Sequence, residues 1–297
     1  MVIVKIIILI LSSDTYPSKR NKKIIQKTWG RSHNKNLDIY FYKAGNETYL
    51  SEDNEIVVKS GKTSIEISKK NIEAFEYVFK NFKFDYLFRT TTTSYVNPDL
   101  LMKFIKSEVQ NEEFVYCGKV MQTNDHSGNS VNFVSGAGIL FNNKVIEKIL
   151  DNKSKLNFDL WDDVGIGKLI SELNIKPIEG FQYEIKGNIF KEKLNVNHYH
   201  YRCRIDNHYG YPRFLEKYVI SYLHKFINKI KISKSKILFW NLTFEISKII
   251  YVQYPFLKLF NFLKSFIKLL IPKIFMKYFY KEYKKINEKI NLRYFKY

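Results

Sequence analysis

The sequence predicts an α/β domain in which helices flank a mostly parallel sheet. Short apolar runs typical of buried strands alternate along the chain with longer segments of helical periodicity. The hydrophobic share of 45% is sufficient for a sizeable core, which argues against disorder. The third observation is the stretch from Phe84 to Asn97, where an apolar run ends in threonines and a helix start follows. Such a polar tip is expected at the carboxyl edge of the sheet, where ligands bind. An ordinary polar loop after a core strand is the alternative.

The first strand is expected between Val2 and Leu11. This stretch is apolar apart from Lys5, and its length of about ten residues is too short to span a bilayer. It has no clear basic region and no clear small-residue cleavage site, so a strand is favoured over a signal peptide.

The remaining elements alternate in the way that the fold class requires. One helix start is marked by Asn97, which can cap the helix, and by Pro98, which fits its first turn. Strands are expected at 37–43, 55–59, 84–88, 114–119, 131–141 and 175–178, and helices at 17–29, 64–82, 98–109, 144–150 and 161–173.

The net charge of +20 is concentrated towards the end of the chain. Residues 217–297 contain 18 Lys and Arg but 3 Asp and Glu, against 49 and 29 in the whole sequence. A nucleic-acid binder would carry its basic face on the folded domain, so nucleic acid is not an expected partner. The two cysteines, Cys117 and Cys203, lie far apart in the sequence and predict no disulfide framework. They fit a reducing, cytoplasmic compartment.

We therefore expect two parts, a domain over residues 1–215 and a basic amphipathic helical tail over 216–297. Between Tyr254 and Tyr283, lysines recur every three or four positions among aromatic and aliphatic residues, with a break at Pro272. A helix pair of this kind is typical of a membrane surface with anionic lipids, and its lysines are too frequent for a spanning helix. A helical cap packed on the core is the alternative. RNA or DNA binding is less favoured, because the aromatic residues face away from the lysines.

The stretch Trp161-Asp162-Asp163-Val164-Gly165-Ile166-Gly167 places two adjacent carboxylates at a helix start. The free backbone N–H groups at such a position stabilise negative charge. A carboxylate there can cap the helix. It can also accept a proton from a substrate hydroxyl if it faces a pocket. Both interpretations remain open from these residues alone.

Two other segments carry candidate binding groups. Ser135-Gly136-Ala137-Gly138 places two glycines inside a strand, which indicates either a bulge or the close approach of a ligand. Further on, His198 and His200 would point to the same side of a strand and could bind a metal, while Arg202 and Arg204 could hold phosphate. A polar segment packed beside the sheet edge is the alternative.

Together these segments resemble the β1,3-glycosyltransferases related to Fringe and the β1,3-galactosyltransferases. Four motifs follow the order seen in that family, over roughly residues 1 to 205: Gln26-Lys27-Thr28-Trp29-Gly30, the threonine-tipped strand, Ser135 to Gly138, and Asp162 to Gly167. The family has a GT-A fold, a nucleotide-sugar donor and an inverting mechanism. The resemblance therefore implies a GT-A-like sheet, a nucleotide-sugar donor and a glycan or glycoprotein acceptor.

The resemblance can be followed residue by residue. Thr28 and Trp29 match the first motif, although Gln26 stands where the family has arginine. Asp163 matches the family's catalytic base, and Asp162 replaces its glutamate neighbour. The glycine motif matches the one that lines the sugar site. The expected donor-binding residues are Ser12, Arg89, Thr91, Thr92, Thr93, Ser135, Gly136 and Gly138.

The main departure from the family lies at the strand tip. Thr91, Thr92 and Thr93 occupy the positions of three aspartates that hold Mn²⁺ in the family. Hydroxyls bind a divalent cation poorly, so Mn²⁺ or Mg²⁺ is a disfavoured cofactor and no metal ligand is assigned. In one interpretation, cations of the protein, Arg89 among them, balance the charge of the leaving diphosphate. Further candidates to contact the diphosphate or the acceptor are Lys119, His198, His200, Arg202 and Arg204.

The sequence thus predicts an inverting hexosyltransferase, peripheral to a membrane, that moves a sugar from a nucleotide-sugar donor to a glycan hydroxyl. A non-catalytic carbohydrate-binding or scaffold relative, anchored by the basic tail, is the alternative. Asp163 and the Ser-Gly-Ala-Gly run favour activity, because a dead enzyme has no need to keep its base.

Overall fold

The computed structural model describes residues 4–31, 34–61, 66–125, 128–205 and 211–252. The chain divides into two compact units, Met1–Arg204 with Glu216–Ile232, and Ile205–Leu215 with Ser233–Tyr297. The first unit contains helix α6 (Glu216–Ile227), which the sequence assigns to the tail. A hydrogen bond of 2.6 Å from Asn21 Nδ2 to Glu216 Oε2 ties α6 to helix α1 (Ser18–Ile25). The sequence places the end of the domain at residue 215, whereas this division keeps α6 in the first unit.

The first unit is built on an eight-stranded mixed sheet with the order β3-β4-β2-β1-β5-β8-β7-β9. Strands β4, β2, β1 and β5 run parallel, while β8 is antiparallel to both of its neighbours. The α/β class and the mostly parallel central strands agree with the prediction. The strands are β1 (Ile6–Leu11), β2 (Leu37–Gly45), β3 (Tyr49–Leu50), β4 (Glu55–Lys59), β5 (Tyr86–Thr91), β7 (Tyr116–Asn124), β8 (Ser130–Asn142) and β9 (Ile178–Glu179).

Strand β1 lies in the middle of this sheet. Its residues pair with β2 on one side and with β5 on the other, so that Ile6 faces Tyr86 and Leu11 faces Thr91. Residues Ile6 to Ile10 are fully buried, which explains why the sequence reads as an uninterrupted apolar run rather than an alternating one. The prediction of a strand at this position is confirmed over Ile6–Leu11.

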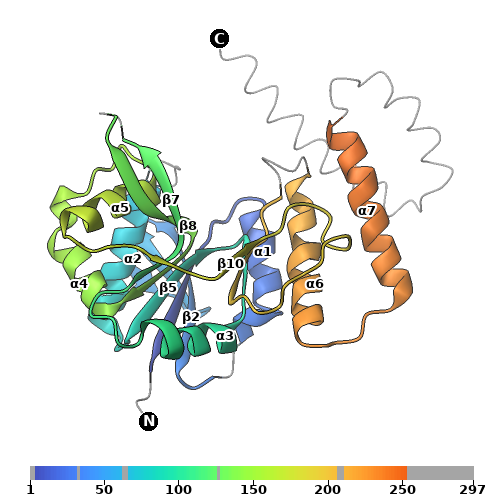
Figure 1. The fold of residues 1–297 in the computed structure, drawn as a ribbon, viewed down its shortest axis with the longest axis horizontal. Coiled ribbons are helices and arrows are strands. Elements are labelled where there is room, and N and C mark those ends of the chain that lie inside the picture. The colour runs from blue at the N-terminus through green and yellow to red at the C-terminus, as the bar shows by residue number, and fades with distance from the viewer. Residues whose placement is uncertain (1–3, 32–33, 62–65, 126–127, 206–210, 253–297) are drawn as a thin grey trace. The chain divides into compact units, whose positions relative to one another are not determined.

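Three helices cover one face of the sheet: α2 (Ile67–Asn81), α4 (Asn143–Asp151) and α5 (Asp162–Glu172). They lie side by side in Figure 1 and contact one another. Alternate residues of the strands, including Ile7 and Leu9 of β1 and Leu87 of β5, join their apolar side chains in one core. Arg89, two positions after Leu87 in β5, points to this same face of the sheet.

The helix predicted to start at Asn97 and Pro98 begins there in the structure. Asn97 caps α3 (Pro98–Phe104) by accepting a hydrogen bond of 3.2 Å from the Leu100 N–H. The helix continues as a π-helical turn over Ile105–Val109, which accounts for the predicted end near residue 109. Asn142 caps α4 in the same way, through the Val145 N–H at 3.1 Å.

A second, three-stranded sheet was not predicted. It consists of β10 (Gln182–Glu184), β11 (His200–Arg202) and β6 (Ser94–Val96), in that order. Each strand has three residues, which is too short to show an alternating pattern. Near the strand expected at 175–178, the structure has only the two residues of β9. The strand expected at 114–119 is β7, which continues to Asn124.

The second unit contains a short 3-10 turn (Arg213–Leu215) and α7 (Lys234–Val252). Tyr211 and Phe244 pack there with their ring centroids 5.7 Å apart. In the part of the chain that is described, no helix is long and apolar enough to cross a membrane. The amphipathic helix pair expected between residues 254 and 283 lies outside the described residues.

Candidate active site

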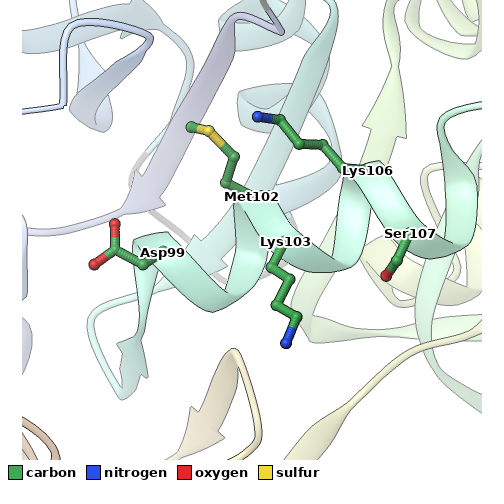
Figure 2. A pocket seen from close by; sticks show the side chains of 5 residues that line it. All are labelled: Asp99, Met102, Lys103, Lys106 and Ser107. Atoms are coloured by element: carbon green, nitrogen blue, oxygen red, sulfur yellow. The ribbon is translucent and has the colours of Figure 1, made fainter. Parts of the chain in front are cut away.

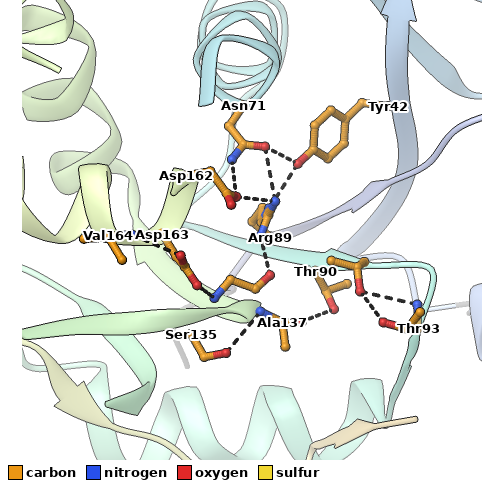
Figure 3. A network of polar contacts seen from close by, with 12 residues as sticks. Tyr42, Asn71, Arg89, Thr90, Thr93, Ser135, Ala137, Asp162, Asp163 and Val164 are labelled. Carbon is orange, nitrogen blue, oxygen red and sulfur yellow. Dashed lines mark hydrogen bonds and ion pairs between the residues drawn. The ribbon is translucent and has the colours of Figure 1, made fainter. Parts of the chain in front are cut away.

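A buried arginine organises the polar centre of the first unit (Figure 3). Arg89 lies near the carboxyl end of β5 and is 2% exposed. Its Nε donates to the Tyr42 hydroxyl at 3.1 Å and its Nη2 to Asp162 Oδ2 at 2.8 Å. Its Nη1 donates to the carbonyl of Gly136. The guanidinium therefore joins β2, β5, β8 and α5 at one point.

An amide from α2 completes this network. Asn71 accepts a hydrogen bond of 2.6 Å from the Tyr42 hydroxyl and donates one of 3.0 Å to Asp162 Oδ2. Asn71 is fully buried. Asp162 is thus held from two sides, by Arg89 of β5 and by Asn71 of α2.

The electrostatics keep Arg89 charged. Burial opposes the positive charge, but Tyr42 and Asp162 outweigh it and raise the pKa of Arg89 above its ordinary value. A buried charge of this kind is tolerated because it is paired and hydrogen-bonded. Each of its three nitrogens donates to a protein group. The expectation that Arg89 meets a diphosphate stays a prediction, and in the structure its side chain is buried among these protein partners.

Asp163 lies beside this network in the first turn of α5. Its Oδ2 accepts the Gly136 N–H at 2.8 Å and its Oδ1 accepts the Val164 N–H at 3.1 Å. Burial and the neighbouring charge of Asp162 raise the pKa of Asp163 above its ordinary value, against the opposing effects of the Gly136 N–H and Arg89. Trp161 is the N-cap residue of α5 and its side chain makes no capping bond. Neither carboxylate is therefore the N-cap of this helix.

The first glycine of the Ser-Gly-Ala-Gly run is required by this arrangement. A Cβ atom at Gly136 would lie 2.9 Å from Arg89 Nη1 and 3.1 Å from Asp163 Oδ2. Gly136 thus brings the backbone of β8 close enough for its N–H to hold Asp163 and its carbonyl to hold Arg89. The predicted irregularity is also present, since the pairing of β7 with β8 shifts register between Gly118 and Val120.

The rest of the run packs against the second sheet. A Cβ atom at Gly138 would lie 2.5 Å from His200 Cε1, so this glycine makes room for a protein side chain. Ser135 is buried, and its Oγ accepts the Ala137 N–H at 3.4 Å. Of the three residues of this motif assigned to the donor site, only Gly136 belongs to the Arg89 network.

The threonine tip makes internal hydrogen bonds. The hydroxyls of Thr91 and Thr93 lie 2.8 Å apart, and Thr92 donates to Ser18 Oγ at 3.1 Å. Thr90 donates to the Ala137 carbonyl at 2.7 Å. These hydroxyls are a poor fit to Mn²⁺ or Mg²⁺, which prefer carboxylate oxygens. Across the described ranges, no group of three or more His, Cys, Asp or Glu residues could hold a metal ion.

Ser12 lies at the end of β1 in a separate charged cluster. Its Oγ contacts the Tyr42 carbonyl at 3.1 Å and Glu55 Oε1 at 3.0 Å. Glu55 is buried and forms ion pairs with Lys22 at 2.8 Å and Lys43 at 3.0 Å. The structure thus brings Ser12 to the carboxyl edge of the sheet, next to a fully paired carboxylate.

The two candidate histidines do not form a pair. His200 is fully buried in β11, its Nε2 lies 3.0 Å from Ser94 Oγ, and burial together with Arg202 lowers the pKa of His200 to about 3. It is therefore neutral. His198 precedes the strand and packs against the rings of Tyr183 and Tyr201.

Two of the candidate cations, Lys119 of β7 and Arg202 of β11, lie beside one carboxylate of β10. Lys119 Nζ lies 3.3 Å from Glu184 Oε2, and Arg202 Nε lies 4.0 Å from Glu184 Oε1. Arg204 is half-buried just beyond β11. Lys119 and Arg202 thus share an acidic partner, which reduces the positive charge they can offer to a diphosphate.

Two hollows lie apart from the Arg89 network. One, of about 420 Å³, lies along α3 and the π-helical turn that continues it, and is lined by Asp99, Met102, Lys103, Lys106 and Ser107 (Figure 2). The other, of about 780 Å³, is bordered by Trp29 and Tyr95, whose ring centroids lie 6.4 Å apart. The tryptophan of the first family motif therefore faces this second hollow. None of the residues lining either hollow belongs to the network of Figure 3.

Sequence reasoning missed two residues of the network, Tyr42 and Asn71. Tyr42 occupies an ordinary position in an alternating strand, and nothing in the sequence distinguishes it. Asn71 did carry a signal, because it stands next to Ile72 on the inward side of an amphipathic helix, where an amide needs a partner. Both hold the Arg89–Asp162 pair in place.

Comparison with known proteins gives fold likenesses only. No protein-family model and no curated protein matches the sequence. Among solved structures, a glycosyltransferase involved in the glycosylation of the major capsid of PBCV-1 is similar at 8% identity and a TM-score of 0.46, over 73% of this chain and 99% of that one. The 4-diphosphocytidyl-2C-methyl-D-erythritol synthase from Anaerococcus prevotii is similar at 14% identity and a TM-score of 0.38, over 59% and 86%. At these values neither likeness assigns a function to this chain.

Proposed function

We propose that this protein is an inverting glycosyltransferase that uses a nucleotide-sugar donor. The observation that carries the proposal is the placement of Asp163, which is held by the Gly136 N–H beside the buried Arg89–Asp162 pair. A carboxylate fixed in this way, with a raised pKa, has the properties of a general base. The resemblance to the Fringe-related enzymes, which rests on the same residues, supports the assignment.

In the proposed reaction, Asp163 accepts the proton of an acceptor hydroxyl. The hydroxyl oxygen forms a bond to the anomeric carbon of the donor sugar. The bond between that carbon and the diphosphate oxygen breaks, and its electron pair leaves with the nucleoside diphosphate. Attack and departure occur on opposite faces, so the configuration inverts. A positioned base contributes about 10²–10⁴-fold to such a step.

Arg89 and Asp162 have positioning roles in this proposal. Asp162 cannot move without breaking its bonds to Arg89 and Asn71, and its neighbour Asp163 is thereby fixed in the first turn of α5. The like charge of Asp162 also raises the pKa of Asp163 and makes it a stronger base. Because the threonine tip is a poor fit to Mn²⁺ or Mg²⁺, we propose that the reaction needs no divalent metal.

A non-catalytic carbohydrate-binding or scaffold protein is the second candidate. It is favoured by Thr91 and Thr93, which stand where the Fringe-related enzymes have metal-binding aspartates. Their hydroxyls are hydrogen-bonded to each other. The release of nucleoside diphosphate, measured over a panel of nucleotide sugars with and without glycan acceptors, separates the two. Release with any donor supports the transferase, whereas binding of sugars without any release supports the second candidate.

We also propose that the protein attaches peripherally to a membrane with anionic lipids, on its cytoplasmic side. The support within the described residues is the apolar surface of α7, where Leu238 is 68% and Leu242 is 55% exposed. Flotation of the full chain with anionic vesicles tests this. A protein that stays at the bottom of the gradient with the vesicles present would rule it out.

A further inference from the structure

The hollow bordered by Trp29 and Tyr95 is the larger of the two described above, and the proposed reaction does not use it. Its volume of about 780 Å³ lies within the range of about 300–1,000 Å³ that is typical of small-molecule sites. Its walls include the 3-10 turn Trp29–Arg31, the start of α3 and the end of α6, and all of its lining residues belong to the first unit.

The hollow lies on the far side of the second sheet from strand β8. Neighbouring residues of a strand point to opposite faces. Ser94 of β6 donates to the Ala137 carbonyl at 3.2 Å, so it faces the strand that holds Asp163. The Tyr95 ring instead packs against His224 of α6, with the ring centroids 6.2 Å apart. The hollow is therefore a place apart from the proposed active site.

Two buried donors in the wall of this hollow lack an acceptor. Trp29 and Tyr95 are 4% and 2% exposed. Trp29 Nε1 has no hydrogen-bond partner among the described residues. The Tyr95 hydroxyl accepts a bond of 3.4 Å from Asn228 Nδ2, and burial raises its pKa, so it keeps its proton. No acceptor for that proton is present in the described ranges. Because an unpaired buried donor costs free energy, a ligand with acceptor oxygens is favoured here.

The exposed part of the lining carries one charge of each sign. Asp99 and Arg31 are both exposed and both line the hollow. Neither makes an ion pair or a side-chain hydrogen bond within the part of the chain that the structure describes. Burial and the charge of Lys225 lower the pKa of His224, so this imidazole is neutral at pH 7. The hollow therefore presents donors and an acceptor without a net charge.

We propose that this hollow binds a pyranose ring of a glycan, at a second site apart from the proposed active site. A sugar hydroxyl both donates and accepts hydrogen bonds, so it can donate to Asp99 and accept from Arg31 and Tyr95. A small anion would meet the carboxylate of Asp99 and a small cation the guanidinium of Arg31, each at a cost. The C–H groups of the ring can pack on Val196 and Ile227, which also line the hollow. The inference rests on the groups of the hollow and does not require the transfer reaction.

The test measures the binding of the methyl glycosides of glucose, galactose and mannose to the full chain, by titration followed with saturation-transfer difference NMR. We expect at least one of them to bind in the millimolar range. Tyr95→Phe removes only the hydroxyl oxygen and should weaken this binding about fivefold. Asp99→Ala should weaken it at least about tenfold, because hydrogen bonds to a charged group are stronger.

Two matched variants serve as controls. Tyr86→Phe removes a buried hydroxyl that donates to the Val109 carbonyl, outside the hollow. Asp53→Ala removes an exposed carboxylate in the turn before β4. Both should bind the glycoside within about twofold of the wild type. Thermal unfolding gives a second readout, since the glycoside should stabilise the wild type and both controls more than Tyr95→Phe or Asp99→Ala.

Three results would overturn the inference. The first is that none of the glycosides binds. The second is that the wild type, Tyr95→Phe and Asp99→Ala bind the glycoside with equal affinity. The third is that glycine or inorganic phosphate binds at these residues while no glycoside does, because the hollow would then take a zwitterion or an anion.

These outcomes are distinct from a failure of the proposed function. Sugar binding that depends on Tyr95 and Asp99, in a protein that releases no nucleoside diphosphate, supports this site and counts against the transferase. Release of nucleoside diphosphate by a protein whose hollow binds no sugar supports the transferase and overturns the second site.

Discussion

Arg89 and Asp162 form a buried ion pair, with 2.8 Å between Nη2 and Oδ2, that links the end of β5 to the first turn of α5. The arginine is 2% exposed and the aspartate side chain 15%. The Tyr42 hydroxyl accepts a hydrogen bond from Arg89 Nε, and Asn71 Nδ2 donates one to Asp162 Oδ2. This pair is the structural basis for the position of Asp163, and its removal should affect both stability and activity.

Replacing Arg89 with methionine should destabilise the fold by about 3–5 kcal/mol, because Asp162 is left as a buried charge without its partner. Asp162→Asn should cost a similar amount for the same reason. Urea denaturation measures both. The double variant Arg89→Met/Asp162→Asn should lose clearly less than the sum of the two single losses. Additive losses would show that the two side chains do not stabilise each other.

Gly136→Ala should reduce transfer while the protein remains folded. The added methyl group would press on Arg89 Nη1 and Asp163 Oδ2, both within 3.1 Å, and displace the base. A loss of about 10²-fold in kcat is expected from such a displacement, with about 1–3 kcal/mol of stability. Asn132→Ala, at an exposed position of the same strand, is the control and should change neither. Full activity in Gly136→Ala would mean that its backbone does not position the base.

The pH profile of kcat/KM should have an acidic limb above the ordinary range of an aspartate. Asp163 must be deprotonated to act as a base, and burial and Asp162 raise its pKa, so activity is lost as the pH falls through that raised value. Asp162→Asn removes one of the raising charges and should move the limb to lower pH. A limb that stays in place in this variant would assign the titration to another group.

Chelation should leave the activity unchanged. The hydroxyls of Thr91 and Thr93 bond to each other, and the described residues contain no group of three or more acidic, histidine or cysteine side chains suited to a metal. Activity assayed after EDTA treatment should therefore equal that of the untreated protein. A large loss that added Mn²⁺ restores would contradict the metal-independent proposal.

The main sheet could be predicted because its strands are long and buried. The run Ile6 to Ile10 and the segment Glu55–Lys59 carry their apolar pattern locally. The second sheet could not be predicted, because Ser94–Val96 pairs with His200–Arg202 across about a hundred residues of sequence. Its strands of three residues have no periodicity of their own, and only tertiary contacts define them.

The site was predictable in its parts but not in its connections. Asp163, Gly136 and Arg89 were each identified, yet Arg89 was expected to face a ligand. It shares a strand face with Leu87, which packs in the core under α2, α4 and α5, so its side chain extends beneath α5 and not into solvent. Tyr42 and Asn71 were missed because a partnership between a strand tyrosine and a helix amide depends on packing that no local pattern shows.

Asp163→Asn tests the central claim most directly. The variant retains the size of the side chain and an oxygen that can accept the Gly136 N–H. Since the pKa of Asp163 is raised in the folded protein, its charged form contributes no stability near neutral pH, and the variant should unfold at a urea concentration no lower than the wild type. With a donor and acceptor that the wild type turns over, the release of nucleoside diphosphate should fall by about 10²–10⁴-fold. Turnover equal to that of the wild type, in a variant shown to be folded, would remove Asp163 from the mechanism and contradict the account.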